Sequence, residues 1–217
     1  MTLSLFDDET MSGPQVVRLG PRAFVFRNRV THVARELLDS IRALESAARF
    51  RHMHTPGGFT MSVGLTNAGR FGWTSDVSGY RYTEQDPSTG QAWPAMPELF
   101  MQLSRQAAEE AGFSGFEPDA CLINRYVPGA RMSLHQDKNE KDFASPIVSV
   151  SLGLEAQFLF GGLQRADKVV RIPLHHGDVM VWGGPDRLRY HGVSPLKPGS
   201  HPLTGELRFN LTFRRAH

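Results

Sequence analysis

Short apolar runs alternate with turns through the second half of the chain, and this pattern constrains the fold more than any other feature. From residue 119 onward, turn pairs such as Pro128-Gly129 and Gly161-Gly162 separate the runs. Many short strands at this spacing are typical of a sandwich or jelly roll. The expected strands cover residues 120–126, 147–154, 157–160, 169–174, 178–182, 191–194 and 206–214.

Two amphipathic segments precede these strands and predict helices. In the first, which begins near Val30, apolar residues from Val33 to Leu44 recur at helical spacing. The second begins at Pro97 and ends at Gly112, and these residue types favour the first and last positions of a helix. Because the helices come first and the strands follow, we expect an α+β fold.

The 217 residues are long enough for one sizeable core but too short for two large domains. We expect a loose leader over about residues 1–20, an irregular β-rich lid over about 50–93, and a strand-rich core over about 115–217. A single cysteine, Cys121, excludes a disulfide framework and suits a reducing compartment. With no signal-peptide pattern and no apolar run near the roughly 20 residues that span a bilayer, we expect a cytoplasmic protein without a membrane partner.

Two histidines and one aspartate predict a metal site among the strands. His135 and Asp137 are two residues apart, so on an extended segment both side chains project to the same side. His191 can join them from a distant strand of a rolled sheet. Two imidazoles and one carboxylate, with open coordination positions, are the ligand set of non-haem iron(II) oxygenases.

A second His-x-Asp match, His176-Gly177-Asp178, has a different context. It lies at a turn, where Gly177 is the expected turn residue and Asp178 is expected to hydrogen-bond the local backbone. We therefore interpret this match as structural. We treat five further histidines as surface or core residues: His52, His54, His175, His201 and His217.

The last expected strand has one polar and one apolar face. Phe209, Leu211 and Phe213 would pack under the helices, and the opposite side chains would point into the roll. Two inward arginines are costly unless anions meet them, and a dicarboxylate supplies two. The alternative is a polar face that meets water, with arginines in surface pairs. The inward set is Arg208, Asn210, Thr212 and Arg214, with Asn124 and Tyr126 as donors from a second strand.

Residues 49–82 combine positive charge with aromatic rings, although the net charge of the chain is only +2. Four arginines stand against the single acid Asp76, and six aromatic residues lie between them. Basic groups interleaved with aromatics suit phosphates and unstacked bases. The alternative is a hairpin whose aromatic side chains simply pack on the body.

At seven motifs the chain resembles the AlkB family of iron- and 2-oxoglutarate-dependent nucleic-acid demethylases. The resemblance runs over nearly the whole length. It implies a double-stranded β-helix (jelly-roll) core with flanking N-terminal helices and a nucleotide-recognition lid. The motifs are residues 55–63, 93–97, 118–126, 133–138, 146–154, 177–184 and 208–214.

The resemblance also implies a role for individual residues. The iron ligands would be His135, Asp137 and His191. The 2-oxoglutarate contacts would be Asn124, Tyr126, Arg208, Asn210 and Arg214. Trp73 would lie over the damaged base, with Tyr80, Arg81, Tyr82 and Arg165 near the nucleotide, and the remaining pocket positions would be Thr55, Met61 and Ser133.

One position departs from the family pattern. The family member that most resembles this chain has a second aspartate two residues after the iron-binding one, and this chain has Asn139 there. An amide can accept a hydrogen bond from an exocyclic amine, but it brings no charge to a cationic base. The preference between methylated adenine and methylated cytosine therefore stays open.

The activity implied by the resemblance is oxidative demethylation of 1-methyladenine and 3-methylcytosine, with dioxygen as co-substrate and formaldehyde, succinate and CO2 as products. Single-stranded DNA is the expected partner, with double-stranded DNA and RNA as further substrates, and the enzyme is expected to be a monomer. Two alternatives stay open. One is a 2-oxoglutarate-dependent hydroxylase of a protein or small molecule, and the other is a cupin-like metal-binding module without redox chemistry.

Overall fold

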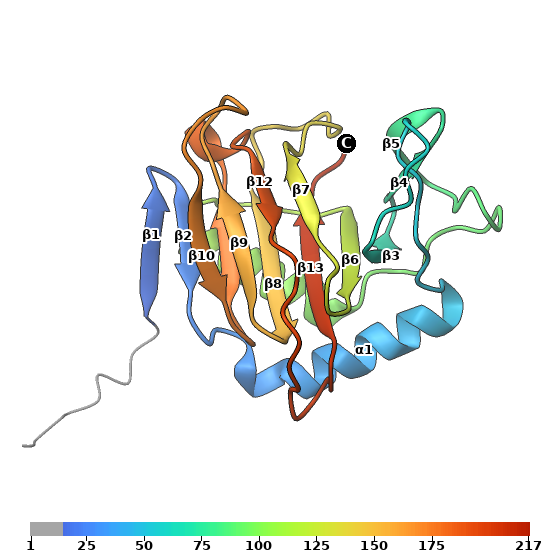
Figure 1. The fold of residues 1–217 in the computed structure, drawn as a ribbon, viewed down its shortest axis with the longest axis horizontal. Helices are drawn as coiled ribbons and strands as arrows, with labels where there is room; N and C mark the ends of the chain where they lie inside the picture. Colours follow the sequence, from blue (N-terminus) through green and yellow to red (C-terminus); the bar gives the residue numbers. More distant parts are fainter. Residues whose placement is uncertain (1–14) are drawn as a thin grey trace, which may run out of the picture.

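Two β-sheets facing each other form the core of the computed structural model, which describes residues 15–217 (Figure 1). The seven-stranded sheet has the order β1-β2-β11-β8-β13-β6-β3, and the four-stranded sheet has the order β10-β9-β12-β7. A separate hairpin pairs β4 with β5. The strands are β1 (Val16–Gly20), β2 (Ala23–Phe26), β3 (Gly64–Gly69), β4 (Gly72–Asp76), β5 (Gly79–Thr83), β6 (Ala120–Tyr126), β7 (Met132–His135), β8 (Ile147–Gly153), β9 (Ala156–Phe160), β10 (Val170–Leu174), β11 (Val179–Trp182), β12 (His191–Val193) and β13 (Arg208–Arg214).

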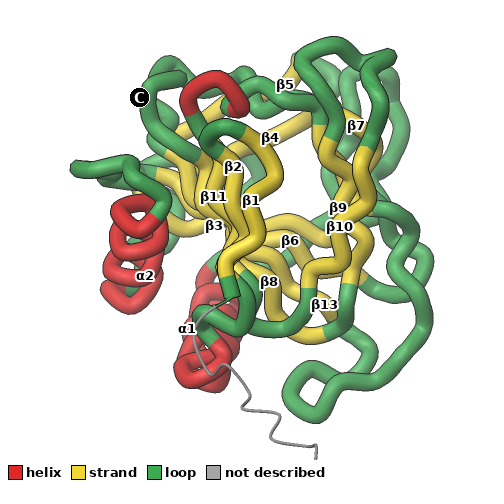
Figure 2. The backbone as a smooth tube through the Cα atoms, turned by 90° about the vertical axis from the view of Figure 1, so that its left-hand side faces the viewer, coloured by secondary structure: helices red, strands yellow, loops and turns green. Residues whose placement is uncertain are grey.

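Two helices, α1 (Ala34–Ala47) and α2 (Glu98–Glu110), cover the outer face of the seven-stranded sheet (Figure 2). Leu37 and Ile41 of α1 and Phe100 of α2 pack in one buried cluster with sheet residues such as Val150 and Leu211. Short 3-10 turns at Thr31–Val33 and Gly184–Asp186 complete the helical elements. The helices thus leave the inner face of this sheet to the space between the two sheets.

Strand β11 shows how that inner space is filled. Val179 and Val181 belong to the cluster under the helices, whereas Met180 and Trp182 belong to the cluster between the sheets. Because both faces of β11 are buried, the strand is apolar throughout instead of alternating. Trp182 packs near Phe158 of the four-stranded sheet, so the core of the roll closes around aromatic side chains.

The α+β class and the jelly-roll core are confirmed, and each of the seven expected strands is present within two residues of its expected bounds. The two expected helices are also confirmed. The structure differs at the N-terminal side, where β1 and β2 extend the main sheet beyond β11. The expected leader of residues 1–20 therefore ends by Val16, and its residues 1–14 lie outside the described part of the chain.

The expected lid is also less separate than the sequence indicates. Its strand β3 pairs with β6 over six residues and forms an edge of the seven-stranded sheet. Turn residues and a glycine at each end of β3 concealed this strand in the sequence. The core sheet thus includes residues that lie well before 115 in the chain. Within the expected lid, the β4–β5 hairpin is the part that is separate from the two main sheets.

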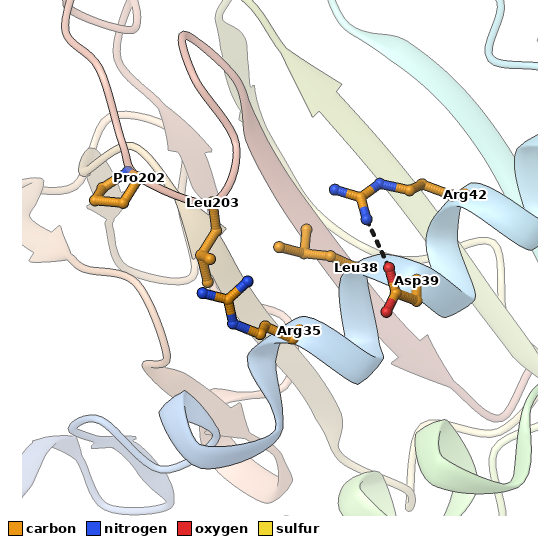
Figure 3. Close-up of a pocket in the computed structure, with 6 residues that line it drawn as sticks. All are labelled: Arg35, Leu38, Asp39, Arg42, Pro202 and Leu203. Carbon is orange, nitrogen blue, oxygen red and sulfur yellow. Dashed lines mark hydrogen bonds and ion pairs between the residues drawn. The ribbon is translucent and has the colours of Figure 1, made fainter.

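A shallow pocket lies between α1 and the loop that precedes β13 (Figure 3). Arg35 and Arg42 of α1 flank it, and Leu203 of the loop contributes an apolar wall. The Arg42 guanidinium is already paired with Asp39. None of the predicted site residues lines this pocket. Within residues 15–217, no helix has the length and hydropathy needed to cross a bilayer.

Candidate metal centre

Antiparallel pairing between β7 and β12 brings the predicted metal ligands together. His135, at the end of β7, is the register partner of His191, at the start of β12. Asp137 follows β7 by two residues, and its carboxylate lies 3.7 Å from the Nε2 atom of each histidine. One ligand atom from each of the three residues fits within a 4.8 Å cluster, so a single metal ion can contact all three.

Local hydrogen bonds orient both imidazoles. The Nδ1 atom of His135 lies 2.8 Å from the carbonyl oxygen of Ser133, and Nδ1 of His191 lies 3.0 Å from that of Arg189. A carbonyl oxygen can only accept, so Nδ1 is the protonated nitrogen in both rings. The lone pair of each Nε2 then points into the cluster, which is the arrangement that metal-binding histidines require.

The protonation states also suit a metal ion. Burial raises the pKa of the Asp137 carboxyl, but Arg214, His191 and His135 together lower it by more, so the group is ionised. Burial and the neighbouring His135 lower the pKa of His191 to about 4. At neutral pH the cluster therefore presents a carboxylate and a neutral imidazole on its buried side, which are the forms that bind a cation.

A second group of predicted residues lies on adjacent strands of the seven-stranded sheet. Arg208 of β13 is the register partner of Tyr126 of β6, and Asn210 is the partner of Asn124. These four side chains line the inner, polar face of the sheet, while Leu211 and Phe213 pack under the helices as expected. The two-faced strand predicted from the sequence is thus confirmed.

Arg208 is charged, buried and incompletely satisfied. It is 1% exposed, and its guanidinium donates to the Leu154 carbonyl and to the Ser151 hydroxyl. Its Nε, like Oδ1 of Asn124, is buried without a hydrogen-bond partner among residues 15–217. Burial lowers the pKa of Arg208 to about 10, so the side chain stays cationic at neutral pH. A buried cation without a carboxylate partner in residues 15–217 calls for an anion, and a carboxylate of 2-oxoglutarate could supply one.

Arg214 reaches the metal cluster instead. Its Nε and Nη2 atoms donate to Oδ2 of Asp137 at 2.8 and 2.6 Å. Burial raises the pKa of the Tyr126 hydroxyl to about 12, so that group is a neutral donor near Arg208. The two arginines therefore mark the two ends of the polar face, one beside the metal ligands and one at the far end of β13.

The second His-x-Asp match has the structural role predicted for it. Gly177 adopts the left-handed conformation with φ of 85°, and Asp178 accepts the backbone N–H of His175 at 2.9 Å. Asp178 also accepts the N–H of Asn28 and pairs with Arg27 at 2.5 Å. Its carboxylate is thus fully engaged in joining β11 to the chain after β2.

One face of the β4–β5 hairpin contacts the loop that follows Asp137. Trp73 and Tyr80 stack with ring centroids 5.6 Å apart, and Tyr80 is 44% exposed. The indole N–H of Trp73 donates to Oδ1 of Asn139 at 3.2 Å. The Tyr82 hydroxyl points inward and donates to Glu140 at 2.7 Å. Three predicted substrate-binding residues therefore share one face, beside the loop that follows Asp137.

The remaining predicted pocket residues divide into two groups. Met61 packs in the same apolar cluster as Trp73 and Tyr126, and Ser133 precedes His135 on β7. Arg165 donates to the Leu134 carbonyl, next to the metal ligand. The structure does not bring Arg81 to this group, because its guanidinium pairs with Asp76 on the opposite face of the hairpin. Thr55 lies in a separate turn, where its hydroxyl accepts the N–H of Phe59.

Two buried charges beside the metal cluster escaped the sequence analysis. Glu140 is 5% exposed and Arg187 is 2% exposed, and they form an ion pair of 3.2 Å. Arg187 also donates to the backbone carbonyl of Asp137 at 2.8 Å. Their sequence signal is weak, since Glu140 stands in the charged run from Lys138 to Asp142, which is typical of a solvated loop.

Comparisons with known proteins agree with this geometry. The model of the 2OG-Fe(II) oxygenase superfamily matches residues 23–214. The alpha-ketoglutarate-dependent dioxygenases AlkB of Salmonella typhimurium and Escherichia coli are 56% and 53% identical to this chain, and each alignment covers 99% of this chain and 98% of the relative. The chain belongs to the AlkB family of this superfamily.

A solved structure extends the comparison to the fold. The structure of OsALKBH1 superposes with a TM-score of 0.82 at 28% identity, covering 93% of this chain and all of that one. The protein is an Fe(II)- and 2-oxoglutarate-dependent dioxygenase, and its donor set fits these groups. His135, Asp137 and His191 could supply the facial ligands for iron, and the Arg208 guanidinium, whose Nε has no partner in residues 15–217, could hold a carboxylate.

Proposed function

We propose that this dioxygenase removes methyl groups from the base nitrogens of alkylated nucleic acid, with 1-methyladenine and 3-methylcytosine as substrates. One observation carries the proposal. The stacked pair Trp73 and Tyr80 stands on the face of the hairpin that is hydrogen-bonded to Asn139, two residues from the metal ligand Asp137. A base stacked on this hairpin is therefore held beside the reacting centre.

Each group at the centre has a distinct task in this proposal. His135, Asp137 and His191 would hold the metal, and Arg208 and Tyr126 would bind the far carboxylate of 2-oxoglutarate. Bound iron, with 2-oxoglutarate and dioxygen, supplies the oxidation of the N-methyl group, which leaves as formaldehyde while succinate and CO2 form. Arg214 keeps the Asp137 carboxylate ionised and oriented during this reaction.

The hairpin also favours a charged base. Both proposed substrates are cations, and a cation over a desolvated tryptophan face gains about 2 kcal/mol. A damaged base must leave its stack to reach the centre, at a cost of a few kcal/mol that is smaller in single strands. We therefore propose single-stranded DNA as the preferred substrate, with double-stranded DNA and RNA as further ones, acted on by a monomeric cytoplasmic enzyme.

A single assay separates this function from its main alternative. The protein is loaded with Fe(II) under anaerobic conditions and then mixed with 2-oxoglutarate, oxygen and a 1-methyladenine oligonucleotide. The products are identified by mass spectrometry. We expect succinate and a loss of one methyl group from the oligonucleotide. Succinate with an unchanged oligonucleotide would instead favour a hydroxylase of a protein or small molecule, and absence of succinate from the metal-loaded protein contradicts both.

A further inference from the structure

Two hydrogen bonds fasten the β4–β5 hairpin to the loop that carries the metal ligand. Trp73 and Tyr82 are register partners in the hairpin, so their side chains leave the same face. Trp73 donates to Asn139 at 3.2 Å, and Tyr82 donates to Glu140 at 2.7 Å. This cross-strand pair thus binds two consecutive residues, Asn139 and Glu140, which follow Asp137 by two and three positions.

Glu140 connects this contact to the metal cluster through two arginines. Arg214 Nε lies 3.4 Å from Oε1 of Glu140, the oxygen that accepts the Tyr82 hydroxyl. Arg187 Nη2 lies 3.2 Å from Oε2, as an ion pair without hydrogen-bond geometry. Both arginines also hold Asp137, Arg214 through its carboxylate and Arg187 through its backbone carbonyl. Among residues 15–217, both charged partners of Glu140 are therefore also partners of Asp137.

The charges in this network balance. Two buried carboxylates, Asp137 and Glu140, face two buried guanidiniums, Arg187 and Arg214. In an interior of low dielectric, such charge-assisted contacts are strong and depend on one another. Arg214 and Arg187 therefore join Asp137 to the Glu140 carboxylate, which accepts the Tyr82 hydroxyl. No comparable charged path joins the opposite face of the hairpin, where Arg81 pairs with Asp76, to the metal cluster in the described residues.

We propose that Glu140 is a positioning residue that couples the hairpin to the metal centre, so that metal and 2-oxoglutarate bound at Asp137 and Arg208 order β5, and a base on the hairpin in turn favours the loaded centre. The inference rests on the proposed function for the identity of the base, but the coupling itself does not require nucleic acid. Because coupling between two sites is reciprocal, it can be measured from the metal side alone.

The test is amide hydrogen exchange of β5 followed by mass spectrometry, with Mn(II) in place of Fe(II) and without oxygen chemistry. In the unmodified protein, Mn(II) and 2-oxoglutarate should slow exchange at residues 79–83 by about tenfold. Tyr82→Phe keeps the ring and removes the hydroxyl. In this variant, Mn(II) and 2-oxoglutarate should no longer slow the exchange, so the rates measured with and without them should be nearly equal. Glu140→Gln should show the same loss and should also weaken Mn(II) binding, as followed by electron paramagnetic resonance.

Glu84→Gln is the matched control. Glu84 directly follows β5 and pairs with Arg70 on the surface, where both side chains are exposed. This variant should keep the full slowing of exchange. If Tyr82→Phe keeps the slowing as well, or if Glu84→Gln loses it, the coupling role of Glu140 is wrong. Tyr82→Phe answers the question even if Glu140→Gln fails to fold, because the hairpin stays anchored by Asn67 and Trp93.

Failure of the proposed function would have a different signature. If the protein forms succinate but leaves 1-methyladenine intact, while Mn(II) and 2-oxoglutarate still slow exchange in β5, the coupling stands and the substrate is another molecule. If demethylation occurs and the exchange of β5 is unaffected by metal, the function stands and the coupling is refuted.

Discussion

His135 and His191 face each other across the β7–β12 pair, as register partners whose ring centroids lie 4.4 Å apart. Each ring is fixed in the same way, by a hydrogen bond from Nδ1 to the carbonyl oxygen two residues earlier in the chain. Two strands that are distant in sequence thus present two identical local motifs to one point. Backbone geometry thus orients both candidate ligands toward one point, which lowers the cost of organising a metal site there.

Replacing one of these histidines should remove the metal site. His191→Ala deletes one of three ligands, so we expect the affinity for Co(II) or Mn(II) to fall by more than about 100-fold, since even the loss of supporting contacts costs 10- to 100-fold. Succinate formation should stop. Titration calorimetry under anaerobic conditions measures the affinity, and retention of tight binding by His191→Ala would show that the cluster is not the metal site.

The charge of Arg208 should govern the affinity for 2-oxoglutarate. Arg208→Gln removes a buried cation that would pair with a carboxylate, and truncating such a pair costs about 2–5 kcal/mol, which corresponds to a Kd that is roughly 30- to 4,000-fold weaker. Metal affinity should change little, because Arg208 does not contact Asp137. Arg171→Gln, at an exposed arginine of β10, is the matched control and should leave the Kd for 2-oxoglutarate unchanged. Equal Kd values for the two variants would exclude Arg208 from the co-substrate site.

The indole of Trp73 should matter for the nucleic acid and not for the co-substrate. In Trp73→Ala a cationic base loses about 2 kcal/mol of stacking on the ring, equivalent to an affinity about 30-fold weaker for a 1-methyladenine oligonucleotide. Trp73→Phe should restore part of this loss. Fluorescence anisotropy of a labelled oligonucleotide measures the effect, and unchanged affinity in Trp73→Ala would remove the hairpin from the binding surface.

The two His-x-Asp matches should respond differently to the same substitution. Asp178 is 1% exposed and paired with the partly buried Arg27, so Asp178→Asn removes the charge that this guanidinium pairs with and should destabilise the fold by about 1–3 kcal/mol. Metal affinity of the folded protein should not change. Asp137→Asn should have the opposite effect, with a large loss of metal affinity and a smaller loss of stability. Urea unfolding and calorimetry together distinguish the two aspartates.

Much of this architecture could be predicted from the sequence because it depends on the period of the apolar residues and on the order of turns and strands along the chain. The alternation from Arg208 to Arg214 specified both faces of β13, and both were confirmed. The turn at Gly177 separated the structural His-x-Asp from the metal-binding candidate for a physical reason, since glycine tolerates a φ of 85°. Local rules sufficed wherever one strand or one turn carried the information.

Features that depend on long-range pairing could not be predicted in this way. Strand β2 is four residues long and apolar on both faces, so it has no alternation to detect, yet it pairs with β11 about 150 residues later. Glu140 lies in a charged run and looks solvated, but the hairpin and two arginines bury it. Its environment is created by Tyr82 and Arg187, which no local pattern associates with it.

Stability should fall in mild acid because of a histidine pair outside the candidate metal cluster. The rings of His176 and His201 lie in a tilted arrangement with centroids 4.3 Å apart, and Nδ1 of His176 accepts the backbone N–H of Gly153. Burial, and then the charge of His201, lower the pKa of His176 below its usual value of 6.5, and burial lowers that of His201 as well. The unfolded chain therefore binds these protons more readily than the folded one.

The direction of the pH effect follows from this difference. A group with a lowered folded-state pKa contributes stability that is present above the unfolded pKa of about 6.5 and is lost as the pH falls through the lower folded value. We expect the free energy of unfolding to decline as the pH falls below about 6.5, and to decline less in His176→Asn, which keeps a side-chain acceptor but does not titrate. Urea unfolding at several pH values measures both slopes. Parallel slopes for the two proteins would show that His176 is not the group responsible.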